Sequence, residues 1–173
     1  MPEDKEPFDD ELNDDEEGDF NPEDYFNDMD DDDLSDEELQ KDMDSHKELP
    51  VFKKAEQIRE LTQRIIDTFD DEKDIFKMKE QMFLNACMLG AKIAGAEGGD
   101  LYTLRMENAV VIKMHARELQ SQTSLCKAEK LCSREYLQLL RDEIEEFRKL
   151  FVEWVNSFDK LNDIQDDWGL FYD

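Results

Sequence analysis

The chain contains little of what would assign it quickly to a functional class. Its 173 residues include only three cysteines, two histidines and six glycines. An odd number of cysteines without the spacing of a disulfide framework favours a reducing compartment. No apolar run approaches the roughly 18 residues that a membrane-spanning helix needs. Residues 2–6 (Pro-Glu-Asp-Lys-Glu) do not resemble a signal peptide, so we expect a cytoplasmic protein with no membrane segment.

Motifs for catalysis and metal binding are also missing. Gly98 and Gly99 precede a predicted helix without the spacing of a phosphate-binding loop, so we interpret them as a helix stop. A di-iron bundle needs two Glu-x-x-His motifs, whereas His115 is the only histidine after residue 48. Buried structural thiols are the usual interpretation of cysteines on helical segments, here Cys87, Cys126 and Cys132. The sequence thus predicts no catalytic residue, no cofactor and no metal site.

Negative charge is abundant, and it is concentrated at the two ends of the chain. The formal net charge is −27. Residues 1–48 hold 24 acids and three lysines (net −21), and residues 156–173 hold five acids and one lysine (net −4). Residues 49–155 hold 19 acids and 17 bases, a net charge of only −2. An acidic protein avoids phosphate backbones and anionic membranes, so direct nucleic-acid binding is disfavoured, except through a cluster of these bases on one face.

This charge pattern predicts three regions. Residues 1–48 combine few apolar side chains with a high net charge, and such segments cannot offset the entropy lost on ordering. We expect a disordered acidic arm over 1–48, a folded domain over 49–158 and a short acidic–aromatic tail over 159–173.

Within residues 49–158, apolar side chains recur at helical spacing in four segments. The second apolar stripe begins at Ile75, and the third segment turns Leu104 inward. Asp100 and Ser133 are expected to cap the third and fourth helices. The fourth segment carries a heptad-like aromatic seam of Phe147, Phe151, Trp154 and Phe158. Four amphipathic helices with short connections predict an all-α, antiparallel four-helix bundle.

Three polar residues interrupt the apolar face of the third helix. Asn108, His115 and Gln122 are seven residues apart, so they drift only about 20° per step and share one face. Buried polar groups need partners, and Asn85 at the edge of the second stripe is one candidate. We interpret the four residues as a buried polar seam that fixes helix register. A ligand site and an oligomer seam remain alternatives.

Aromatic residues are scattered among the acids at both ends. The candidates are Phe20, Tyr25 and Phe26 in the arm and Trp168, Leu170, Phe171 and Tyr172 in the tail. Acidic–aromatic segments can dock on basic, grooved partners and fold as they bind. The alternative is that the acids only keep the chain soluble.

Two segments resemble a known family. Residues 49–55 (Leu-Pro-Val-Phe-Lys-Lys-Ala) resemble the L-x-V-W-x-x-A opening of bacterial four-helix-bundle proteins encoded within ribosomal RNA intervening sequences, with Phe52 in place of Trp. Residues 93–98, ending Ala-Glu-Gly, are similar to that family's N-I-A-E-G helix end without its Asn. The resemblance implies a non-enzymatic bundle that self-associates. It also implies kinship with accessory proteins of retroelements, which bind a reverse transcriptase and nucleic acid.

We therefore expect an interaction or scaffold protein: a homo-oligomeric bundle that presents acidic arms to basic protein partners. The aromatic seam of the fourth helix offers more apolar surface than one small core needs, which motivates the oligomer. One alternative is a nucleic-acid mimic or a regulator of a nucleic-acid-binding protein. Another is an accessory bundle whose core binds RNA or a polymerase.

Overall fold

The structure, a computed structural model, describes residues 45–164, 168 and 170. These residues belong to one compact unit, residues 36–173. A short 3₁₀ helix, η1 (Ser45–Glu48), is followed by four α-helices. They are α3 (Pro50–Ile66), α4 (Met78–Glu97), α5 (Tyr102–Glu129) and α6 (Arg134–Asn156). The described part of the chain is therefore all-α, as the periodicity predicts, and the expected disorder of the arm concerns residues that lie largely outside it.

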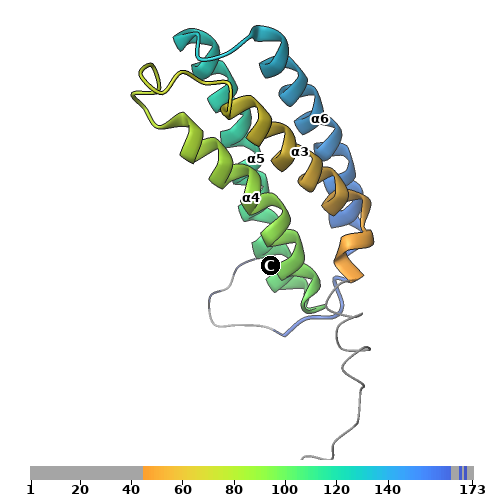
Figure 1. The fold of residues 1–173 in the computed structure, drawn as a ribbon. Helices are drawn as coiled ribbons and strands as arrows, with labels where there is room; N and C mark the ends of the chain where they lie inside the picture. The colour runs from red at the N-terminus through yellow and green to blue at the C-terminus, as the bar shows by residue number, and fades with distance from the viewer. Residues whose placement is uncertain (1–44, 165–167, 169, 171–173) are drawn as a thin grey trace, which may run out of the picture. The chain divides into compact units, whose positions relative to one another are not determined.

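The four helices form a closed ring of neighbours. Helix α3 packs against α4 and α6, and α5 packs against the same two helices, while the backbones of the diagonal pairs do not approach closely. Short connections join helices that lie side by side in Figure 1, so consecutive helices run antiparallel. The predicted antiparallel four-helix bundle is confirmed.

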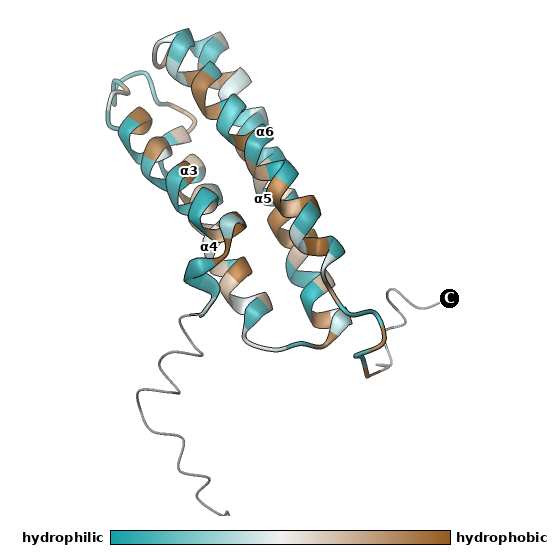
Figure 2. Ribbon diagram, turned by 90° about the vertical axis from the view of Figure 1, so that its right-hand side faces the viewer, coloured by the Kyte–Doolittle hydropathy of each residue, from teal (hydrophilic) through white to brown (hydrophobic). Residues whose placement is uncertain are grey.

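The core consists of the apolar stripes of all four helices. Ile58, Met82, Ile112 and Leu140 are fully buried, one from each helix. In Figure 2, hydrophobic and hydrophilic residues alternate along α3 and α6, as expected for helices with one apolar face and one polar face. Fully burying an aliphatic side chain of this size contributes about 1.5–3 kcal/mol, so these stripes hold the helices together.

The predicted N-terminal cap of α6 is confirmed, whereas the predicted cap of α5 is wrong. Ser133 Oγ accepts a hydrogen bond from the backbone N–H of Tyr136 (3.3 Å), as predicted. Asp100 was expected to cap α5, but the residue at the N-cap position is Leu101 and its side chain makes no capping bond. The cap comes instead from the C-terminal segment, because the Asp163 carboxylate accepts from Thr103 N (3.2 Å) and Thr103 Oγ1 (2.7 Å).

The segment after α6 is thus attached to the bundle. Besides the Asp163 contact, the backbone N–H of Tyr102 donates to the carbonyl of Asn162 (2.8 Å). The Asn162 side chain donates to the carbonyl of Asp100 (3.3 Å). Residues up to 164, which the sequence assigned to an acidic tail, therefore pack beside the first turn of α5.

Two apolar residues lie differently from the prediction. Ile75 precedes α4, which starts at Met78, and 73% of its surface is exposed. Asp74, four residues before the helix, caps its first turn, since its carboxylate accepts from the backbone N–H groups of Met78 (2.7 Å) and Lys79 (3.0 Å). Leu104 was expected to face inward on α5 but is 54% exposed.

No helix in the described range is long and apolar enough to cross a membrane.

At one end of the bundle a polar cluster joins three helices. Glu97, at the end of α4, accepts hydrogen bonds from Arg105 of α5 and from the Trp154 indole of α6 (2.8 Å). The Arg105 guanidinium also lies over the Phe158 ring, 4.2 Å from its centroid. Because the charged pair is only partly exposed, it fixes the relative positions of the three helix ends.

Candidate interaction surfaces and the buried polar network

Three of the four residues of the predicted polar seam are joined by hydrogen bonds. Asn85 Nδ2 donates to Gln122 Oε1 (3.0 Å), and Asn85 Oδ1 lies 2.7 Å from His115 Nδ1. Since an amide oxygen only accepts, His115 Nδ1 carries the proton in this contact. Asn85 on α4 therefore satisfies groups two turns apart on α5, which fixes the register of the two helices.

The fourth residue, Asn108, is not part of this network. Its side chain donates to the carbonyl of Leu104 in its own helix (2.9 Å). Its oxygen lies beside α4, because a Cβ placed on Gly95 would be 3.6 Å from it. Within the network, Gln122 Nε2 is buried and makes no hydrogen bond. An unpaired buried amide hydrogen costs about 1–3 kcal/mol, so the seam is an incompletely satisfied element of the core.

Helix α4 carries a second apolar stripe, which the sequence interpretation overlooked. Leu84, Met88, Ala91 and Gly95 recur at spacings of four, three and four residues, on the side of the helix away from the core stripe. Leu84 is 59% exposed, and Ala91 and Gly95 are also exposed. No charged residue occurs between Glu80 and Lys92. A helix that is apolar on nearly all sides normally has partners on all sides.

Helix α5 extends this surface. Leu104 and Val111 share the side of Asn108 and His115, and His115 bonds Asn85 of α4. Met114 lies further towards the outer side of α5 and is 63% exposed. Asn108 lies beside Gly95, which places this side of α5 next to the α4 stripe. We call the combined surface the α4/α5 face; it comprises Leu84, Met88, Ala91, Gly95, Leu104, Val111 and Met114. Charged residues lie on and beside it: Glu107 lies between Leu104 and Val111 on α5, Glu118 lies one turn beyond Met114, and Lys92 lies on α4.

The aromatic residues of α6 occupy a different place from the one expected. Phe147, Trp154 and Phe158 are buried in the core, and Phe151 is half-buried against it. Phe151 stacks beside Phe147 (6.0 Å between centroids), and Trp154 meets Phe158 edge-on (4.8 Å). The aromatic seam is therefore part of the core. The argument that this seam supplies surplus apolar surface for an oligomer is wrong. Apolar residues of α4 and α5 are more strongly exposed (Leu84 59%, Met114 63%) than Leu139 and Val152 of α6 (both 44%).

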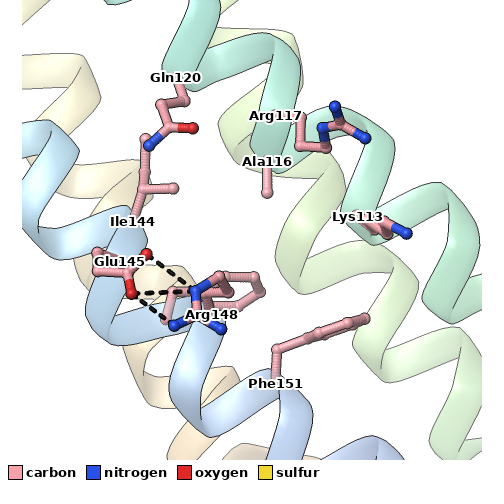
Figure 3. A pocket seen from close by; sticks show the side chains of 9 residues that line it. Lys113, Ala116, Arg117, Gln120, Ile144, Glu145, Arg148 and Phe151 are labelled. Atoms are coloured by element: carbon pink, nitrogen blue, oxygen red, sulfur yellow. Dashed lines mark hydrogen bonds and ion pairs between the residues drawn. The ribbon is translucent and has the colours of Figure 1, made fainter.

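A pocket of about 80 Å³ lies between α5 and α6 on the other flank of α5. Its apolar floor is formed by Ala116, Ile144, Phe147 and Phe151, and its rim by Lys113, Arg117, Gln120, Glu145 and Arg148. Figure 3 shows Lys113 and Arg117 on one wall and Arg148 on the other, with Glu145 bonded to Arg148. The pocket thus combines apolar surface with exposed cations.

Unpaired cations concentrate on the same two helices. Ten of the 17 bases in residues 49–155 form ion pairs with acids, for example Lys54 with Glu143 (2.9 Å). The bases without an ion pair among the described residues are Lys92, Lys113, Arg117, Lys127, Lys130, Arg134 and Arg141. All except Lys92 lie on α5, on α6 or in the turn between them. Residues 102–156 nevertheless hold nine bases and nine acids (9 − 9 = 0), so the cations form local spots on a neutral surface.

Most of the acidic–aromatic candidates lie outside the described residues. These are Phe20, Tyr25 and Phe26 of the arm and Phe171 and Tyr172 of the tail. The two described members are exposed: Trp168 at 85% and Leu170 at 51%. Their apolar side chains are therefore not buried in the bundle.

The three cysteines are free thiols. Burial raises the pKa of the Cys126 thiol to about 12. Its Sγ lies 3.4 Å from the sulfur of Met82. Burial also raises the pKa values of Cys87 and Cys132. A nucleophilic cysteine needs a lowered pKa, so these thiols have the character of core residues.

Among the described residues, no group of three His, Cys, Asp or Glu side chains is arranged to hold a metal ion. The features with potential for recognition are thus the α4/α5 face and the α5/α6 pocket, which lie on opposite flanks of α5.

No protein-family model matches the chain, and a comparison with curated proteins finds no match.

Proposed function

We propose that this chain is a non-enzymatic interaction protein whose bundle self-associates and presents acidic segments to basic protein partners. The observation that carries the proposal is the α4/α5 face. It gathers exposed Leu84, Leu104 and Met114 around the small residues Ala91 and Gly95. Large contiguous apolar patches on a soluble surface mark interaction sites.

A second copy of the chain is the occupant that this face fits best. The face offers both projecting side chains and a shallow region at Ala91 and Gly95, so two copies related by a twofold axis can insert one into the other. Opposite charges lie on and beside it, with Lys92 on α4 and Glu107 and Glu118 on the same stripe of α5 as Leu104 and Met114. In a twofold contact, a base of one copy can therefore meet an acid of the other at the rim.

Sedimentation of the full chain at micromolar concentrations tests self-association. The wild type is expected to sediment as an oligomer, and Leu84→Glu and Met114→Glu to sediment as monomers, because each buries a charge in the apolar contact. The matched controls are Leu139→Glu and Val152→Glu, which change exposed apolar residues of α6 and leave the α4/α5 face intact. A monomeric wild type, or equal dissociation of the α6 controls, contradicts the proposal.

The acidic segments are proposed to bind basic protein surfaces. Residues 1–48 carry a net charge of −21, so the attraction should weaken steeply as salt screens it. A pull-down with the full chain and with a chain lacking residues 1–44 separates partners of the arm from partners of the bundle. Basic proteins captured only by the full chain, and released by raised salt, support this role. Identical captures by both chains contradict it.

A further inference from the structure

The rim of the α5/α6 pocket carries cations without an ion pair among the described residues, and these cations lie beside an apolar floor. Lys113 and Arg117 lie one helical turn apart on its rim, and neither has an ion pair among the described residues. Arg148 across the pocket is already bonded to Glu145 through its Nε (2.9 Å). An incoming carboxylate therefore meets two available cations from α5, directly above the floor of Ala116 and Phe151.

The size of the pocket restricts what it can hold. Its volume of about 80 Å³ is roughly half of the 150 Å³ cavity that encloses benzene in an engineered protein core. It therefore accepts the edge of one aromatic ring rather than a whole buried ring. A peptide with an aromatic side chain next to aspartates matches both the floor and the rim.

The chain contains such a peptide close by. Residues 166–173 read Asp-Asp-Trp-Gly-Leu-Phe-Tyr-Asp. They follow Ile164, and the neighbouring Asp163 is bonded to Thr103 at the start of α5. Ala116 on the pocket floor is 13 residues beyond Thr103 (116 − 103), about 20 Å along the helix.

The length of this stretch determines which residue reaches the pocket. Phe171 is seven residues beyond Ile164 (171 − 164), which spans at most about 25 Å when extended. Trp168 is four residues beyond it (168 − 164), and its side chain is 85% exposed, so it does not occupy the pocket.

We propose that the α5/α6 pocket holds the acidic–aromatic stretch 166–173 of the same chain. The Phe171 ring enters the apolar floor, and the stretch's aspartates face Lys113 and Arg117. The contact lies on the flank of α5 opposite the α4/α5 face, so it does not depend on self-association.

Photo-crosslinking in the full chain tests the proposal. With p-benzoylphenylalanine in place of Phe171, illumination should give intramolecular adducts within residues 113–120 and 144–151. The same probe in place of Trp168 should give few adducts there, since the side chain at that position is 85% exposed and lies outside the pocket. The double variant Lys113→Glu, Arg117→Glu should lower the adduct yield of the position-171 probe roughly five- to tenfold, because two attractions become repulsions.

The matched charge control is Lys127→Glu with Arg134→Glu, which reverses two exposed cations away from the pocket and should leave the yield unchanged. Circular dichroism checks that each variant retains its helix content. Adducts elsewhere on the bundle, no adducts, or adducts only between chains would overturn the proposal. So would an equal fall in yield for both double variants, since that pattern indicates unspecific charge attraction.

Discussion

Asn85 shows how one side chain can set the register of two helices. It donates to Gln122 and accepts from His115, so both polar groups of its amide are used inside the α4–α5 contact. A slip of one residue along either helix would leave the amide without these partners. The seven-residue spacing of polar residues on α5 predicted that such a network exists. It could not predict that Asn108 bonds the carbonyl of Leu104 within its own helix, because the spacing does not show which polar residue finds a partner across the helix contact.

Replacing Asn85 by alanine should destabilise the bundle by about 2–3 kcal/mol, because Gln122 and His115 lose their partner while buried or half-buried. The free energy of unfolding from urea denaturation measures this loss. The triple variant Asn85→Leu, His115→Leu, Gln122→Leu is the control, since replacing all members of a hydrogen-bonded network by apolar groups is close to neutral. If it loses as much stability as Asn85→Ala, the cost comes from altered packing and not from unpaired polar groups.

Cys126 should be the slowest thiol to react. Its pKa of about 12 means that almost no thiolate exists at pH 8, and its side chain is fully buried. Iodoacetamide labelling followed by mass spectrometry should modify the half-buried Cys87 and Cys132 first and Cys126 only as the bundle unfolds. The raised pKa implies that burial of the neutral thiol stabilises the fold below about pH 9 and that this contribution is lost towards pH 12. Rapid labelling of Cys126 in the folded chain contradicts this account.

At the scale of whole elements, the start of α5 depends on residues that are far away in the sequence. The expected cap, Asp100, lies one residue before Leu101 at the N-cap position, and Asp163 takes the capping role. Capping preferences are local, so the sequence can identify acids near a helix start. Only the folded chain brings a distant carboxylate to it. The connection before α4 shows the local case, where Asp74 bonds two N–H groups and leaves Ile75 exposed.

Asp163→Ala should therefore lower the free energy of unfolding by about 1 kcal/mol, the usual contribution of a helix cap. Asp100→Ala is the matched control and should change stability little, because the Asp100 contact to Asn162 uses its backbone carbonyl. Thermal unfolding followed by circular dichroism compares the two variants. An equal or larger loss for Asp100→Ala would contradict the assignment of the cap.

At the scale of the whole molecule, the helices divide into two pairs. Helices α3 and α6 bury one face and expose a charged one, whereas α4 and α5 keep apolar residues on their outer flanks. The spacing of Leu84, Met88, Ala91 and Gly95 in the sequence already indicated a second apolar stripe on α4. That signal is ambiguous without the fold, because the stripe and the core stripe lie on opposite sides of the same helix and both are apolar. Either stripe could have faced inward.

Self-association through the α4/α5 face predicts a melting temperature that depends on protein concentration. Each tenfold increase in concentration should raise the melting temperature of the wild type by a few degrees, because association stabilises only the folded state. Leu84→Glu should melt independently of concentration. Differential scanning fluorimetry over a concentration series measures both. A concentration-independent wild type would show that the face is not an interface between copies under these conditions.

The sequence by itself determined the class of fold, because helical periodicity and the punctuation by Gly98 and Ser133 are local properties of the chain. It also determined where the charge lies, with −21 in residues 1–48 and −2 in residues 49–155. Only the tertiary structure decided which apolar stripe faces the core and which stays outside. It turned the aromatic seam of α6 inward and left the α4/α5 face exposed, because burial depends on which helices become neighbours.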